Sequence, residues 1–125
     1  MEYIEMHIDE MKSVKESWKC YFKMAKNNLK HIQNIEETKE NRWELKSLTM
    51  SYTYFIDQIS KIVKIYSELI NLAEDCELEE KDFVDAMKVV QKLNNDLHIE
   101  SNKKTFKSLN IKYIESLRPA KNITL

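Results

Sequence analysis

Apolar residues recur at every third or fourth position along the central part of the chain. The positions are Leu45, Leu48, Tyr52, Phe55, Ile59, Ile62, Tyr66, Leu69, Ala73 and Cys76. A period of about 3.5 residues sustained over several heptads indicates one long helix with a continuous buried stripe. Ile56, Val63 and Ile70 widen the stripe, which is more typical of a bundle interior than of a two-stranded coiled coil. We expect this helix at about 40–75, in contact with at least two neighbours.

A second long amphipathic pattern precedes it. Apolar residues repeat every seven positions at Ile4, Met11, Trp18, Ala25 and Ile32, and further apolar residues fill the same face. This predicts a helix at about 3–36 with Trp18 in the core. The polar link at 36–41 is short, which favours an antiparallel hairpin, and Thr38 or Asn41 is suited to cap the next helix. Because no Gly or Pro marks this link, one continuous helix remains an alternative.

Two shorter helical patterns follow, at about 79–97 and 102–117. Acidic residues crowd the start of the first, where the helix dipole favours negative charge, and Ser101 is suited to cap the second. Pro119 ends the pattern, and 119–125 is expected to be a frayed tail. The chain has no glycine, which tight hairpins between strands require. The sequence therefore predicts a single all-α domain at 1–118, an antiparallel helical bundle of two long and two shorter helices.

The unequal helix lengths suggest an uncovered surface. If the two short helices pack side by side, they cover only the half of the long hairpin that holds 1–18 and 60–76. The other half then exposes apolar side chains, which typically mark an interface. These are Leu29, Ile32, Ile35, Trp43, Leu45, Leu48 and Tyr52. If the short helices instead lie end to end, they cover the whole hairpin. We expect the side-by-side arrangement, with Trp43 as either a local staple or an interface anchor.

Composition limits the classes of partner. The net charge is -1, so no overall attraction to nucleic acid or anionic lipid is expected. Cys20 and Cys76 fall inside helical patterns and are expected to be buried free thiols of a reducing compartment. The sequence shows no signal peptide and no apolar segment long enough to span a membrane, so a cytoplasmic protein is expected. The excess of lysine over arginine is typical of a phage or an AT-rich bacterial source.

Charge is unevenly distributed along the chain. The first helix carries a lysine stripe opposite its apolar face, and the last helix adds more lysines. They are Lys12, Lys15, Lys19, Lys23, Lys26, Lys30, Lys103, Lys104 and Lys107. This stripe is either a solvated face or a site for a phosphate backbone or an acidic protein. Arginine, the preferred base-reading residue, occurs only at Arg42 and Arg118, which argues against sequence-specific DNA recognition.

No catalytic or metal-binding constellation emerges from the sequence. A carboxylate-bridged di-iron bundle needs Glu three residues before His on two helices. The residues three before His7, His31 and His98 are Ile4, Asn28 and Asn95. The absence of glycine excludes phosphate-binding loops and dinucleotide fingerprints, and Cys20 has no adjacent His to activate it. We therefore expect no catalytic residue, no metal and no cofactor.

The leading functional hypothesis is a non-enzymatic protein–protein interaction module of the inhibitor, immunity, adaptor or regulator type. It would bind a protein partner, or itself as a homodimer, through the apolar tip of the long hairpin around Trp43. The alternative hypothesis is a nucleic-acid-associated protein that uses the lysine stripe together with the basic last helix.

Overall fold

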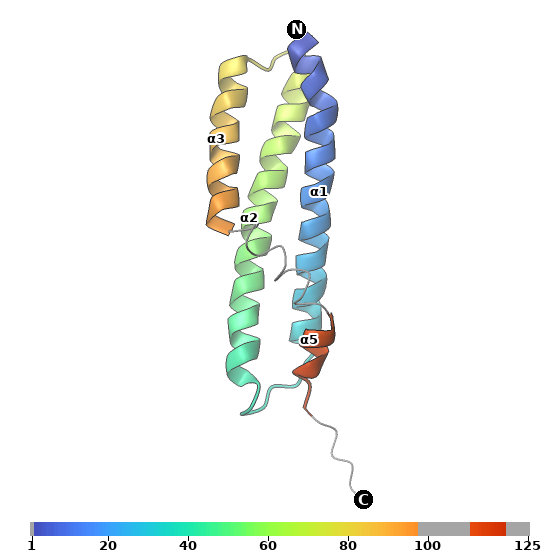
Figure 1. The fold of residues 1–125 in the computed structure, drawn as a ribbon, viewed down its shortest axis with the longest axis vertical. Helices are drawn as coiled ribbons and strands as arrows, with labels where there is room; N and C mark the ends of the chain where they lie inside the picture. Colours follow the sequence, from blue (N-terminus) through green and yellow to red (C-terminus); the bar gives the residue numbers. More distant parts are fainter. Residues whose placement is uncertain (1, 98–110, 120–125) are drawn as a thin grey trace, which may run out of the picture.

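The computed structural model describes residues 2–97 and 111–119, with side chains from residue 8 and from residue 114 onward in the two ranges. Four helices make up this part of the chain: α1 (Glu2–Gln33), α2 (Arg42–Glu74), α3 (Glu80–Leu97) and α5 (Ile111–Ser116). The described residues form no strand. α1 and α2 run antiparallel as a long hairpin (Figure 1), so the predicted all-α hairpin bundle is confirmed.

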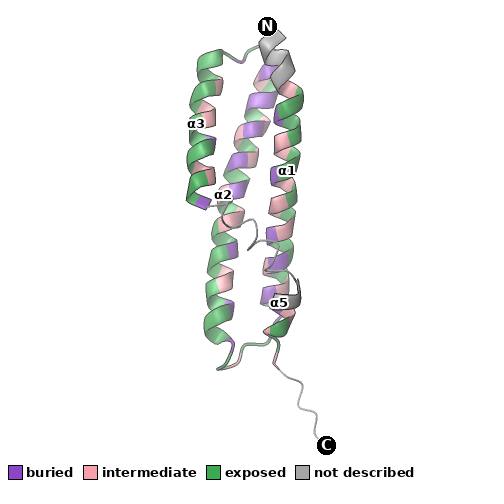
Figure 2. Cartoon of the chain, viewed as in Figure 1, coloured by how far each residue is buried: buried purple, intermediate pink, exposed green. Residues whose placement is uncertain are grey.

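The predicted apolar stripes of α1 and α2 form the core. Met11, Trp18, Ala25 and Ile32 of α1 are buried, and so is most of the α2 stripe. Figure 2 shows these buried positions along the facing sides of the two helices. A polar residue, Asn28, lies among the buried side chains of the hairpin, and its side-chain amide donates a hydrogen bond of 3.1 Å to the buried Tyr52 hydroxyl. Burial raises the pKa of Tyr52, and the bond from Asn28 acts in the opposite direction.

The link between the long helices is a true turn, so the alternative of one continuous helix is wrong. Asn41 occupies the N-cap position of α2, but its side chain does not cap the helix. Its Oδ1 accepts a hydrogen bond from the Thr38 backbone N–H, while its Nδ2 donates to the backbone oxygens of Glu36 and Leu117. Asn41 is buried and thereby ties the turn to the segment after α5.

The end of α2 requires a left-handed residue, and Cys76 supplies it with φ of 57°. The Cys76 and Glu77 backbone N–H groups bond to the carbonyls of Ala73 and Leu72, which is the pattern of a Schellman motif. The motif carries Cys76 out of the helix into solvent. Cys76 and Cys20 are both exposed free thiols, so the prediction that they are buried is wrong.

The shorter helices lie along the hairpin one after the other. α3 packs against the half of α2 that leads into it, and α5 packs against the end of α1 next to the turn (Figure 1). The expected side-by-side pair is therefore wrong for the helical segments that the structure describes. The physical reason for this placement is that two contacts hold α5 at the turn. Asn41 bonds to Leu117, and His31 Nδ1 lies 3.7 Å from Glu115 Oε1. The predicted helical residues 102–110 and the Ser101 cap lie outside the described residues, as do 120–125.

Candidate interaction surfaces

Most of the predicted interface residues are not on the surface. Ile32, Ile35, Leu45 and Tyr52 are buried, and Leu29 and Leu48 are half-buried. The expectation that they form an exposed patch was wrong because these residues pack between α1 and α2 themselves, and Ile114 of α5 adds to the same core. Trp43 is the exception, with 79% of its surface exposed. It is no buried staple, and its role as an interface anchor stays a prediction.

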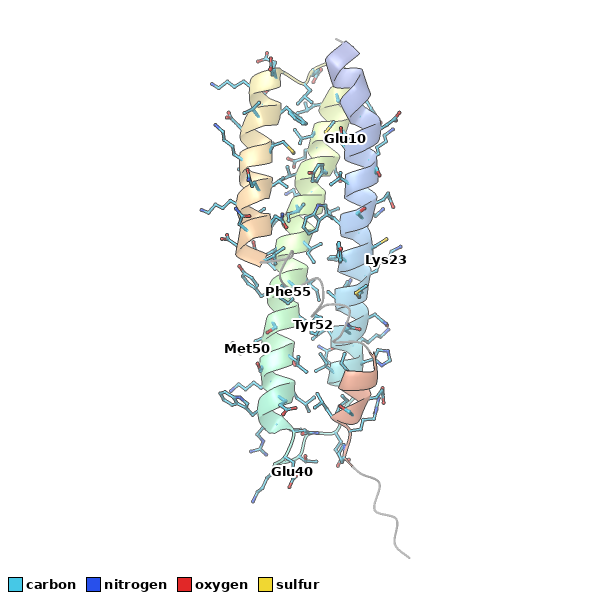
Figure 3. The ribbon with its side chains drawn as sticks, in the orientation of Figure 1. Glu10, Lys23, Glu40, Met50, Tyr52 and Phe55 are labelled. Atoms are coloured by element: carbon cyan, nitrogen blue, oxygen red, sulfur yellow. The ribbon has the colours of Figure 1, made fainter. Side chains whose placement is uncertain are left out.

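Trp43 shares its face of α2 with two other exposed apolar side chains. Met50 is 67% exposed and Tyr54 is 44% exposed. Figure 3 shows Met50 pointing away from α1, whereas Tyr52 lies between the two long helices. Lys46 and Ser47 sit between Trp43 and Met50, and these four residues line a shallow hollow of about 250 Å³. We call Trp43, Lys46, Ser47, Met50 and Tyr54 the α2 outer face.

The α2 outer face follows from helical spacing. Trp43, Met50 and Tyr54 are separated by seven and four residues, so they share one side of the helix, opposite the buried stripe. The same side becomes charged after Tyr54, where Asp57 and Lys61 form an ion pair of 3.2 Å. Apolar exposure on this side is thus confined to the first four turns of α2, while the rest of the side is an ordinary solvated surface.

The sequence already indicates the α2 outer face, because it has apolar residues at positions outside the buried stripe. Met50 and Tyr54 fall outside the 3.5-residue period, on positions that a bundle helix normally fills with polar residues. The buried position of Asn28 was also predictable from the sequence, although it was not identified there. Asn28 occupies the heptad position shared by Val14, Tyr21 and Ile35, where a polar residue indicates a buried hydrogen bond.

The predicted lysine stripe is partly engaged within the molecule. Lys12 Nζ lies 2.8 Å from Glu74 Oε1, which raises the pKa of Lys12, and Lys19 pairs with Glu16 at 3.5 Å. Lys26 Nζ sits 5.1 Å from the centre of the Phe22 ring.

The remaining lysines of the stripe differ in their surroundings. Lys23 projects from the outer side of α1 (Figure 3). Lys15 is half-buried and Lys30 is exposed. Lys103, Lys104 and Lys107 lie outside the described residues, so the basic last helix of the alternative hypothesis stays a prediction.

Titratable groups also gather where α5 meets α1. Arg118 donates hydrogen bonds to Glu115 through Nε and Nη2, and this contact, together with His31, lowers the pKa of Glu115. Both side chains lie close to the surface, and the contact of Glu115 with His31 joins α5 to α1. Within 2–97 and 111–119, no group of three or more His, Cys, Asp or Glu side chains is arranged to hold a metal ion. None of the helices described is long and apolar enough to cross a membrane.

Comparison of the chain with known protein families, with curated proteins and with solved structures gave no match.

Proposed function

We propose that this protein is a non-enzymatic interaction module that self-associates through the α2 outer face. The observation that carries the proposal is the exposure of Trp43 beside Met50 and Tyr54 on one side of α2. Large aromatic side chains are costly to leave in water and are enriched among the residues that dominate binding energy. A contiguous exposed apolar surface of this kind typically marks a site of protein association.

The pattern of the α2 outer face is self-complementary, which favours a second copy of the chain as the occupant. In an antiparallel pair of α2 helices, Trp43 can face Tyr54 of the other copy while Ser47 faces its Met50. Both pairings share one centre, between residues 48 and 49, as a two-fold axis requires. Two Trp–Tyr contacts would form, each of a kind worth about 0.5–1.5 kcal/mol beyond buried area.

The length of the apolar surface fits this register. In the antiparallel pair, the start of one α2 lies beside Tyr54 of the other, so the overlap ends before Asp57 and Lys61. The charged part of α2 then remains in solvent, where its ion pair already lies. The apolar segment is thus as long as the overlap that would cover it.

The size of the face predicts a weak dimer. The exposed parts of Trp43, Met50 and Tyr54 amount to roughly 400 Å² per copy, given about 150–250 Å² for a large side chain. Two copies would bury about 800 Å² from these residues, below the roughly 1,200–2,000 Å² of a stable complex. Lys46 and Ser47 add area at the edges, and we expect dissociation constants in the range of about 10–1,000 µM.

Sedimentation equilibrium between about 10 µM and 1 mM protein tests self-association. Wild type should shift from monomer toward dimer, whereas Trp43→Ala should stay monomeric with unchanged helicity by circular dichroism. Val89→Ala removes an exposed apolar side chain from α3 and should behave as wild type. A wild-type monomer at every concentration, or equal association of Trp43→Ala and wild type, would refute the proposal.

Crosslinking tests the register in a background of Cys20→Ser and Cys76→Ser. A mixture of Ser47→Cys and Met50→Cys chains should form disulfide dimers faster than either variant alone, because only the mixture places the two thiols opposite each other. Lys61→Cys should crosslink little, since the two copies of residue 61 lie roughly 40 Å apart in this register. Faster crosslinking of each variant with itself would instead indicate parallel helices.

A further inference from the structure

A second surface, on the side of the hairpin between α1 and α2, has a different character. It is a groove of about 560 Å³, and its described lining residues all belong to α1 and α2. They are Lys26, Asn27, Leu29, Lys30, Gln33 and Ile56, and we call this set the α1–α2 groove. Leu29 and Ile56 form a half-buried apolar floor, while Lys26 and Lys30 are exposed at the rim.

α5 packs against a different side of α1. His31, which contacts Glu115 of α5, is about 100° around the helix from Lys30 on the rim of the groove. In agreement with this, no described residue of α5 is among those that line the groove. This surface also differs from the α2 outer face, because Ile56 and Met50 point to different sides of α2.

The two rims of the groove differ in charge. The α1 rim carries Lys26 and Lys30, and the structure records no ion pair between either lysine and another described residue. On α2, the positions next to Ile56 at helical spacing carry no charge: they are Thr49, Tyr52, Thr53, Ile59, Ser60 and Val63. The hydroxyls of Thr49 and Thr53 donate 2.7 Å hydrogen bonds to the backbone oxygens of Leu45 and Thr49. No carboxylate at these described α2 positions therefore offsets the lysines.

We infer that the α1–α2 groove receives an acidic amphipathic helix of a partner protein. An apolar stripe at positions i, i+3 or i+4, and i+7 would lie on Leu29 and Ile56, and glutamates flanking it would meet Lys26 and Lys30. A helix in this place would pack against both long helices of the hairpin, as neighbouring helices of a bundle do. This inference rests on the groove and holds independently of self-association through Trp43.

The apolar floor distinguishes this partner from a nucleic acid. A phosphate backbone gains nothing from Leu29 or Ile56, and none of the described lining residues is an arginine that could form paired bonds to phosphate. The ring of Phe22, one heptad before Leu29, already has the Lys26 ammonium group over it, 5.1 Å from the ring centre. An apolar surface beside unneutralised lysines instead suits a helix with an acidic flank.

The test is fluorescence anisotropy with three labelled synthetic peptides, each of about 18 residues, which is long enough for a helix that carries the i to i+7 stripe. They share one apolar stripe and differ only in Glu, Gln or Lys flanks. At about 50 mM salt, the Glu-flanked peptide should bind about five- to tenfold tighter than the Gln-flanked one, as expected for two exposed ion pairs. The difference should shrink at about 200 mM salt because exposed charges are screened. Leu29→Ala should weaken the binding of both the Glu-flanked and the Gln-flanked peptide.

Charge reversal separates a direct contact from a general effect of charge. The double variant Lys26→Glu/Lys30→Glu should lose affinity for the Glu-flanked peptide and gain affinity for the Lys-flanked peptide. Lys88→Glu/Lys92→Glu changes the net charge equally on exposed positions of α3 and should keep the wild-type preference. Trp43→Ala should also keep the wild-type preference for the Glu-flanked peptide. Loss of self-association in this variant can therefore be distinguished from loss of peptide binding in the groove.

Three outcomes would overturn the inference. They are equal affinity for the Glu-flanked and Gln-flanked peptides, no binding of any peptide, and binding of a DNA duplex of about 20 base pairs that exceeds peptide binding and is unaffected by Leu29→Ala. The last outcome would assign the lysines to a phosphate backbone.

Discussion

Asn41 binds two residues of the turn and one residue after α5, which makes its substitution a direct test of the fold around the turn. Its side chain accepts one hydrogen bond of 2.7 Å from Thr38 and donates two of 2.9 Å, to Glu36 and to Leu117. The bond to Leu117 spans 76 positions of sequence and holds the end of α5 against the turn. We expect Asn41→Ala to loosen α5 as well as the turn.

The size of the effect follows from these three bonds. Each intramolecular hydrogen bond contributes about 1 kcal/mol net, and a buried group that loses its partner costs about 1–3 kcal/mol. Asn41 is 5% exposed, but the backbone groups it contacts are only partly buried, so water replaces some of the lost bonds. We expect Asn41→Ala to lower the free energy of unfolding by about 2–3 kcal/mol, a large fraction of a typical total of about 5–15 kcal/mol.

Asn41→Asp adds a dependence on pH with a defined sign. The introduced carboxylate can still accept from Thr38, but its second oxygen would face the carbonyls of Glu36 and Leu117. Because the charged form is disfavoured in the folded state, the pKa of the introduced carboxyl group would be raised above its unfolded value. The loss of stability relative to wild type is then largest near pH 7 and shrinks as pH falls to about 4, where the protonated acid can donate.

Urea unfolding followed by circular dichroism at about pH 7 and pH 4 measures these differences, and hydrogen exchange reports on α5. Asn27→Asp is the matched control, because Asn27 is exposed near the end of α1 and its substitution should change stability by less than about 0.5 kcal/mol at both pH values. A loss below about 0.5 kcal/mol for Asn41→Ala, or identical behaviour of the two Asn→Asp variants, would contradict the reasoning.

Three further predictions concern single side chains. Tyr52→Phe removes the acceptor of the Asn28 bond inside the core and should lower the free energy of unfolding by about 1–2 kcal/mol in urea titrations. Cys76→Gly relieves the left-handed backbone and should raise stability by about 0.5–1 kcal/mol, whereas Cys76→Ala, which keeps a Cβ, should not. The pKa of Glu115 is lowered chiefly by Arg118, so its contribution to stability is present above the ordinary carboxyl pKa and is lost as pH falls through the lowered value. Glu115→Gln should therefore flatten the acid side of the stability profile, and an unchanged profile would speak against this role.

The helices were predictable because their apolar spacing is regular over many turns. The stripe from Leu45 to Ala73 and the heptads around Met11 and Trp18 identify α1 and α2 and their antiparallel packing, and the structure confirms them. The third helix was predicted at about 79–97, and α3 (Glu80–Leu97) buries Val90 and Leu97, which are seven residues apart on one side of it. Burial of apolar residues at helical spacing is a local property that the sequence encodes directly.

The exposure of individual residues was less predictable. Ile35, Leu45 and Trp43 are close in sequence and all apolar or aromatic, yet the first two are buried and the third is exposed. Their difference depends on which way each side chain points after the turn at 34–41, and that turn contains no Gly or Pro to fix its shape. Cys76 shows the same limit, since its own left-handed backbone conformation takes it out of the predicted apolar stripe and into solvent.

The sequence by itself determined that this protein is a helical hairpin with a lysine-rich first helix and a tryptophan at the start of the second. Only the tertiary structure decided how the shorter helices are placed, because that depends on contacts between residues far apart in the chain, such as Asn41 with Leu117. The fold buries most of the expected interface and leaves the α2 outer face and the α1–α2 groove as the surfaces on which binding can be tested. Periodicity records which side of a helix is apolar, but only the packing of the whole chain determines which apolar side chains remain in contact with water.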